Sequence, residues 1–355
     1  MNDTAVQRYA AATLLGLGER LFSRAGLPVD RAQVMAEVLL EGDLLGHTTH
    51  GYALLDPYLQ SIKDGGMQKI GEPSVLADDA ASFMWDGRYL PGPWLVRQAI
   101  HEARARLAGH GVVTGVIRRS HHIACLQAYL KPVTDAGLLI LLTTSVPALR
   151  RVAPFGSVEP CFSPNPLAAG IPTEGDPVLL DISLSTTSGF RCARTANAGE
   201  RLPGAWLVDA DGNPTDDPGP FVHDHQGALY NLGGADLGYK GFGLALVVEA
   251  LTNALAGHGR ADAEDRWACS VFLQIIDPGR FGGQAAFVRE TSFLARACRN
   301  AAVPASRPGV RLPGQAALAR REEQLKNGVA LHPDILTALE PWAQEFDVPL
   351  PCAAG

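Results

Sequence analysis

The chain has 355 residues, of which 46% are hydrophobic and 19% charged, so it can bury a sizeable core and is not a disordered polypeptide. Its formal net charge of -7, without any run of lysine and arginine, excludes nucleic acid as an expected partner. Six cysteines without a C-x-x-C pair indicate reduced thiols in the cytoplasm, and the most apolar stretches, 136–145 and 241–256, are too short or too interrupted to span a membrane.

The N-terminal region has a helical pattern. Apolar residues recur at helical spacing from Val6 to Phe22. Asp30 is expected to cap a second helix, and a third, short helix is expected between the glycines at 51 and 65. Residues 1–75 are therefore predicted to form a helical domain.

Short runs rich in β-forming residues follow, bounded by glycine, proline or aspartate, and helical patterns lie between some of them. Strands are predicted at 112–117, 138–144, 178–182, 206–208 and 270–276. Helices are predicted at 94–107, 125–135 and 243–255, and again near the C-terminus at 287–299, 316–326 and 333–346. A turn at 209–214 is expected to link two strands.

This order of helices, sheet and helices predicts an α+β fold, because regular βαβ alternation is missing. Residues 76–284 are expected to form the α+β domain, and helices from about 285 to 350 are expected to join the helical domain. No G-x-G-x-x-G sequence stands between a strand and a helix, since the nearest match, at 16–18, lies inside a helical pattern. A Rossmann dinucleotide site is therefore excluded.

Histidines form two candidate sites. His47 and His50, one turn after Asp43, could share a helix face and bind zinc, although a structural or surface role for His47 is favoured because no third ligand is evident. Thr49 beside His50 could fix a tautomer for proton transfer.

His122, in the pair 121–122, follows a predicted strand and could protonate a substrate atom at the edge of a sheet. An ordinary surface histidine is an equally good interpretation. Four nearby arginines could orient a carboxylate through paired N–H donors, or could form a solvated basic face: Arg118, Arg119, Arg150 and Arg151.

A glycine-rich segment at 233–243, which contains Lys240, is expected to lead into a helix. Small residues and a lysine before a helix N-terminus suit an anion such as a cofactor phosphate. A tight turn with an exposed lysine is the alternative.

These motifs, taken in order, resemble the malate/L-lactate dehydrogenase type 2 family, which includes malate, sulfolactate and ureidoglycolate dehydrogenases, diketogulonate reductase and reductases of cyclic imines. The resemblance covers residues 11–336. Its landmarks are GHTTHG at 46–51, RSHH at 119–122, TSVP at 144–147, NPLA at 165–168, DIS at 181–183, YKGFGLA at 239–245 and RLPG at 311–314.

The resemblance implies a non-Rossmann NAD(P)-binding α+β domain with a mixed or antiparallel sheet, packed against a helical domain. It implies that NADPH or NADH donates hydride to a small-molecule substrate while His50 or His122, assisted by Thr49, supplies a proton. It also implies a homodimer. By matched position, the residues that line the cofactor are His122, Ser145, Asp181, Ile182, Ser183, Lys240, Arg311, Pro313 and Gly314.

Three positions depart from the family pattern where it contacts substrate. Leu54 replaces an arginine that grips the substrate carboxylate, Pro164 replaces a threonine, and Arg119 replaces an asparagine. Either Arg119 has taken over the carboxylate, or the substrate is larger and less polar than a simple 2-oxo acid.

Four interpretations follow. The first is reduction of a ketone or 2-oxo acid, with a specialised substrate. The second is reduction of a cyclic or N-substituted imine. The third is a family relative that has lost hydride transfer and binds a ligand. The fourth, a metal-dependent hydrolase built on His47 and His50, has the weakest support.

Overall fold

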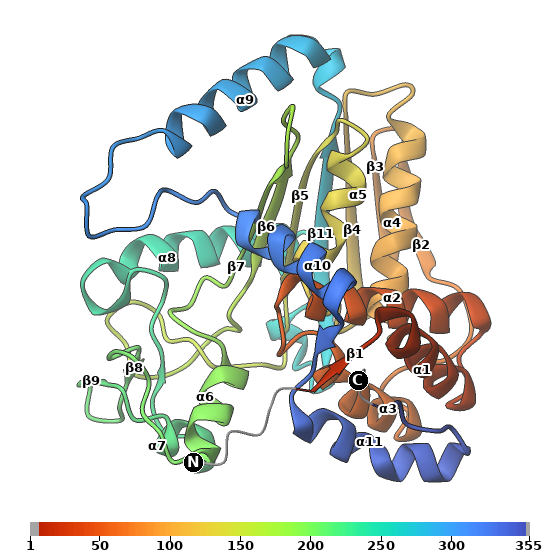
Figure 1. The fold of residues 1–355 in the computed structure, drawn as a ribbon, viewed down its shortest axis with the longest axis vertical. Coiled ribbons are helices and arrows are strands. Elements are labelled where there is room, and N and C mark those ends of the chain that lie inside the picture. Colours follow the sequence, from red (N-terminus) through yellow and green to blue (C-terminus); the bar gives the residue numbers. More distant parts are fainter. Residues whose placement is uncertain (1–6, 353–355) are drawn as a thin grey trace.

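A seven-stranded sheet forms the centre of the computed structural model, which describes residues 7–352 (Figure 1). In sheet order the strands are β2 (Ser74–Asp79), β3 (Ser82–Asp86), β4 (Val112–His121), β11 (Ala268–Ile276), β5 (Leu139–Ser145), β6 (Leu167–Ile171) and β7 (Val178–Ile182). Strands β3 and β4 run parallel, whereas the other neighbouring pairs are antiparallel. This mixed sheet confirms the predicted α+β fold.

The two faces of the central strands are buried against different helices, as the period of two along a strand requires. One face packs into the main core with α4 (Gly92–Arg106), and it includes Val113 and Ile117 of β4 and Leu273 of β11. The opposite face carries Val116 and Phe272, which pack with the π-helical turn η3 (Ala250–Ala254). Both sheet faces are therefore covered, and the strand ends remain to form a site.

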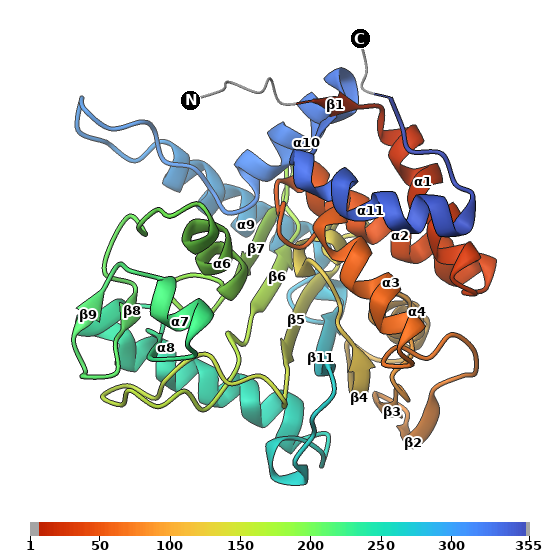
Figure 2. The same ribbon diagram turned by 90° about the horizontal axis from the view of Figure 1, so that it is seen from below.

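Helices from the two ends of the chain pack together beside the sheet (Figure 2). Arg8–Tyr9 (β1) pairs with Val329–Ala330 (β12) and ties these ends to each other. The helices of this group are α1 (Ala11–Arg24), α2 (Val29–Leu45), η1 (Tyr52–Leu54), α3 (Leu55–Lys63), α10 (Gln315–Asn327) and α11 (Pro333–Phe346).

Two expectations for this group were wrong. The first helix begins at Ala11, because Arg8 and Tyr9 are extended and pair with β12; Val6 lies outside the described residues. Asp30 does not cap the second helix, since Pro28 precedes it and Asp30 lies in its first turn without a side-chain cap bond.

A smaller group of elements covers the β7 side of the molecule and has its own apolar cluster (Figure 1). It consists of α6 (Gly189–Asn197), α7 (Gly219–His223), α8 (Gly234–Glu249) and a three-stranded sheet in the order β10 (Ala228–Leu229), β8 (Leu207–Val208), β9 (Pro214–Thr215). The predicted turn at 209–214 links β8 and β9.

The glycine-rich segment was assigned wrongly, because α8 begins at Gly234 and most of the segment is helix, not a loop before it. Close packing explains Gly241, because a side chain there would collide with the backbone of Leu232. Lys240 consequently lies on an exposed face of α8.

The remaining elements connect these groups. They are η2 (Leu126–Tyr129), α5 (Lys131–Thr134), η4 (Arg260–Asp262), η5 (Pro278–Arg280) and α9 (Gln284–Arg299). Within residues 7–352, no helix is both long enough and apolar enough to cross a bilayer.

Candidate active site

A cavity of about 550 Å³ lies where the helical group, the ends of the sheet strands and the smaller group meet. Its size is in the range of small-molecule sites. Its lining comprises His47, Thr49, His50, His122, Ala124, Cys125, Leu126, Thr144, Val146, Leu149, Arg151, Ser163, Pro164, Pro166, Asp181, Ser183, Ser188, Gly189, Phe190, Ala193, Phe221, Val222 and Trp267.

His50 and His122 face each other across part of this cavity, with ring centroids 5.8 Å apart. Thr49 Oγ1 lies 2.9 Å from Nδ1 of His50. Tyr58 Oη lies 2.7 Å from Nδ1 of His122, and the backbone N–H of Ala124 donates to the same nitrogen at 3.3 Å. A neutral His122 ring therefore accepts at Nδ1 and carries its proton on Nε2.

Local backbone geometry holds both imidazoles in place. The buried carboxylate of Asp43 accepts the N–H of Tyr52 at 2.6 Å, and this bond closes the turn after His50. A side chain at Gly51 would overlap that carboxylate, and one at Gly92 would overlap the backbone of His121 and His122. Glycine at these positions lets α2 and α4 approach the histidine segments closely.

Burial lowers the pKa of both histidines. The pKa of His50 falls to about 4, through desolvation first and the charge of His47 second. The pKa of His122 lies well below 6.5, again through desolvation and then through His50 and His121. Both rings are therefore neutral at pH 7, the form that accepts a proton from a hydroxyl group.

Aromatic side chains pack around the two imidazoles. Trp267 stacks on His122 with centroids 4.9 Å apart, and Phe190 meets His50 edge-on at 5.6 Å. Leu149, Phe221 and Val222 extend the apolar lining. Such walls exclude water and favour a substrate with an apolar body.

Arg151 is the one lysine or arginine among the described residues that line the cavity. Its guanidinium lies 5.3 Å from the ring centroid of Phe221. A guanidinium at an apolar wall is suited to a carboxylate or a phosphate.

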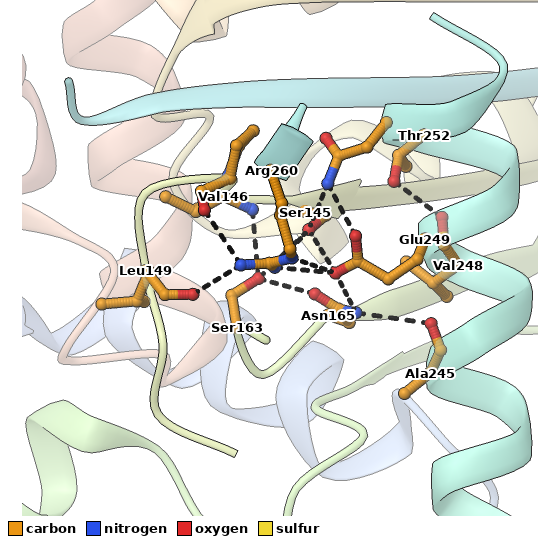
Figure 3. Close-up of polar contacts among 12 residues, drawn as sticks. Ser145, Val146, Leu149, Ser163, Asn165, Ala245, Val248, Glu249, Thr252 and Arg260 are labelled. Carbon is orange, nitrogen blue, oxygen red and sulfur yellow. Dashed lines mark hydrogen bonds and ion pairs between the residues drawn. The ribbon is translucent and has the colours of Figure 1, made fainter. Parts of the chain in front are cut away.

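A partly buried polar network lies beside the segment that carries Val146 and Leu149 (Figure 3). Glu249, the last residue of α8, accepts from Arg260 at 2.7 Å and from Ser145 at 2.9 Å. It also accepts from the amides of Asn165 and Asn253 at 2.9 and 2.7 Å. Arg260 in turn donates to the carbonyls of Pro147 and Leu149, both at 2.9 Å, so the network fixes the cavity wall.

Burial alone would raise the pKa of Glu249, but the hydrogen bonds and charge of Arg260 and the two amides lower it below its usual value. Glu249→Ala is therefore expected to reduce the free energy of unfolding by about 2–4 kcal/mol, because it leaves a partly buried arginine and several donors without their acceptor. Urea denaturation measures the change. Glu290→Ala, which removes an exposed ion pair with Arg289, should change stability by less than about 0.5 kcal/mol; an equal loss in both variants would contradict the role of the network.

The structure brings several predicted site residues together. His50, His122, Thr49, Pro164, Asp181 and Ser183 all line the cavity.

The other predicted residues lie outside the set that lines the cavity. Leu54 is fully buried in the main core, and Ser145 belongs to the network around Glu249. Arg119 forms an ion pair with the buried Asp86 and would have to leave it to reach a substrate. Ile182 is the last residue of β7, and Lys240 lies on α8. The loop at 311–314 contacts β7 through a hydrogen bond of 3.1 Å, in which the N–H of Leu179 donates to the carbonyl of Pro313.

Sequence reasoning missed two residues beside the histidines, Trp267 and Phe190, because single aromatic residues carry no motif. Tyr58, which contacts Nδ1 of His122, belongs to none of the sequence motifs either. His121, by contrast, is a core residue: it is 1% exposed and its Nε2 lies 2.9 Å from Ser61 Oγ.

Comparison with known proteins gives a match to the model of the malate/L-lactate dehydrogenase family over residues 9–340. An L-lactate dehydrogenase of Cupriavidus necator is 28% identical, with 95% of this chain and 97% of the relative covered. A Δ1-pyrroline-2-carboxylate/Δ1-piperideine-2-carboxylate reductase of Pseudomonas putida is also 28% identical, over 96% and 98% of the two chains. A malate dehydrogenase structure from Entamoeba histolytica has the same fold, with a TM-score of 0.92, 21% identity and coverage of 98% and 99%.

Proposed function

The chain belongs to the malate/L-lactate dehydrogenase family and is an NAD(P)H-dependent oxidoreductase, and we propose that it reduces a bulky ketone or 2-oxo acid in the cavity beside His50 and His122. The observation that carries this proposal is the pair of imidazoles, each held at Nδ1 and packed against an aromatic ring. Two such groups in one apolar cavity suit proton transfer to a carbonyl oxygen.

The chemistry of the proposed reaction is divided between the cofactor and the protein. The reduced nicotinamide supplies the hydride. His50 or His122, in its charged form, donates the Nε2 proton and becomes neutral, while Thr49 and Tyr58 contact the opposite nitrogen of each ring. Trp267 packs against His122 and limits the access of water.

The residues present fit a dinucleotide. Asp181 offers a carboxylate and Ser183 a hydroxyl in the cavity wall, and groups of this kind hydrogen-bond ribose hydroxyls. Ser188, the N-cap of α6, and Gly189, its first residue, also line the cavity, so that backbone N–H groups at the start of this helix are available to a phosphate. We propose the remaining predicted contacts, Ser145, Ile182, Lys240, Arg311, Pro313 and Gly314, as residues that support or complete this site.

Arg151 is proposed to hold the anionic group of the substrate. Arg151→Gln is expected to raise the KM of a 2-oxo acid about 10–100-fold, with a smaller change in kcat, because a charge-assisted hydrogen bond is lost from the bound state. The sequence-based alternative is Arg119. If Arg119→Gln raised this KM and Arg151→Gln did not, the anion would lie at Arg119. The KM of the cofactor, measured in parallel, shows whether Arg151 binds the carboxylate of the substrate or a phosphate of the cofactor.

An imine substrate is the second candidate, because the relatives of similar identity include both a lactate dehydrogenase and a cyclic imine reductase. NADH and NADPH oxidation should be measured with matched keto and cyclic imino forms of several apolar substrates. Higher kcat/KM for the imino forms would favour the second candidate. Fluorescence titration with NADPH and NADH tests the proposal as a whole, and no binding of either would favour a relative that has lost hydride transfer.

We also propose that the protein is a cytoplasmic homodimer. Grouped exposed apolar side chains are typical of protein–protein contacts, and helix α8 exposes five of them: Leu237, Tyr239, Leu244, Leu246 and Val247. Light scattering should give twice the chain mass of 37.6 kDa, and Leu246→Glu should shift it toward one chain mass. A wild-type protein that stays at one chain mass would contradict the dimer.

A further inference from the structure

Three potential metal ligands meet in the wall of the cavity. His47, Cys125 and Asp181 each place one ligand atom within 4.8 Å of the others. They come from three separate segments, after α2, after β4 and at the end of β7, and all three line the cavity. A nitrogen, a sulfur and a carboxylate oxygen form a donor set that zinc accepts and that calcium or magnesium does not favour.

Gln127 braces two of these ligands. Its backbone N–H donates to Asp181 Oδ2 at 2.8 Å, and its side-chain Oε1 lies 2.8 Å from His47 Nε2. Its side-chain NH₂ donates to Leu179 O at 2.8 Å, which fixes the direction of the amide. Partners of this kind orient metal ligands and raise affinity in known metal sites.

Among the described residues, no lysine or arginine forms a hydrogen bond or ion pair with Asp181. It accepts from Gln127 N and from the thiol of Cys125, whose Sγ lies 3.7 Å from Oδ2. No salt bridge within residues 7–352 includes it. A carboxylate withdrawn from water without a positive charge is unfavourable, and a bound cation would compensate it.

We propose that His47, Cys125 and Asp181 bind one divalent transition-metal ion of the zinc class, with its fourth position open to the cavity. On binding, the Sγ–H bond of Cys125 breaks as the sulfur–metal bond forms, and the proton leaves to solvent without any change in oxidation state. The apparent affinity therefore increases with pH.

The ion would act as an inhibitor. It occupies the same cavity as His50 and His122, and it uses Asp181, which the proposed function assigns to the cofactor. Zn²⁺ and NADPH are thus expected to compete. This consequence rests on the proposed function, whereas the binding of the metal does not.

The experiment uses Co²⁺ as a spectroscopic probe on chelator-treated protein without cofactor or substrate. The exposed thiols are first removed by Cys161→Ala and Cys352→Ala. Titration should give one Co²⁺ per chain with thiolate-to-cobalt charge-transfer absorption, which Zn²⁺ displaces. Cys125→Ala should abolish this absorption, and Asp181→Asn should weaken binding at least about tenfold.

Cys192→Ala is the matched control, because this thiol is also buried but lies in α6 within a different apolar cluster; it should bind Co²⁺ normally. Persistence of the charge-transfer absorption in Cys125→Ala, or the absence of one-to-one binding in the parent protein, would overturn the site. Should Cys125→Ala not fold, the half-buried His47 provides the second variant: His47→Gln must weaken binding at least about tenfold. Zn²⁺ binding that leaves NADPH titration unchanged would overturn the inhibition alone.

Discussion

Replacement of His122 by alanine is expected to slow NAD(P)H oxidation by about 10²–10⁴-fold, the range that a positioned acid–base group contributes. His122 stacks on Trp267 and is held at Nδ1 by Tyr58, so its Nε2 has a fixed position in the cavity. His50→Ala is expected to cause a loss of similar size if His50 is the donor. Initial rates at saturating cofactor measure both variants.

The pattern among the variants identifies the donor. If the two imidazoles act as one unit, the double variant is no slower than the worse single variant. His101→Ala, on the exposed side of α4, should retain full activity. Thermal unfolding checks that each variant is folded. Full activity in both His50→Ala and His122→Ala would remove them from the mechanism.

Much of the fold could be predicted from local patterns. The strand at 178–182 and the helix at 333–346 have the expected bounds, because a short apolar run after Pro177 and a helix start at Pro333 are strong local signals. β6 was missed since Leu167–Ile171 contains two alanines and a glycine, which have low strand propensity. Hydrogen bonds to β5 and β7 stabilise this strand, and the residues of the segment alone do not indicate which strands it pairs with.

Sequence motifs predicted only part of the candidate active site, namely the residues that lie within those motifs. His50, His122 and Asp181 were found through segments of two to six residues. Among four nearby arginines, the sequence favoured Arg119 for the substrate carboxylate. In the structure Arg119 forms an ion pair with Asp86, whereas Arg151 lines the cavity, and a sequence motif does not reveal this tertiary arrangement.

The rate of reduction is expected to depend steeply on pH. A pKa of about 4 for His50 means that about one ring in a thousand is charged at pH 7, and only the charged ring can donate a proton efficiently. If His50 is the donor, kcat/KM for reduction by the free enzyme should therefore rise about tenfold for each unit that pH falls from 7 toward 4. If His122 is the donor, kcat/KM should also rise as pH falls, because burial lowers the pKa of His122 too. The reverse oxidation needs the neutral ring and should be nearly constant above about pH 5.

Folding must be measured at each pH, since the same burial affects stability. Folded-state pKa values of about 4 for His50 and about 3 for His121 lie below the unfolded value of 6.5. The unfolded chain therefore binds more protons, and stability falls as pH falls from 6.5. Burial raises the pKa of Asp43 to about 7, so the folded chain binds more protons at this group than the unfolded chain does between pH 3.8 and 7. Asp43 therefore adds stability as pH falls through this range.

The bound state should titrate differently from the free enzyme. An anion held near Arg151, or a cofactor phosphate, brings negative charge into the cavity and raises the pKa of a neighbouring imidazole. For reduction, kcat reports the enzyme–substrate complex and kcat/KM reports the free enzyme. As pH rises, kcat should consequently decline at a higher pH than kcat/KM does. Arg151→Gln should reduce this separation if the arginine holds the anion there. Identical profiles for kcat and kcat/KM would mean that the bound anion does not set the charge of the proton donor.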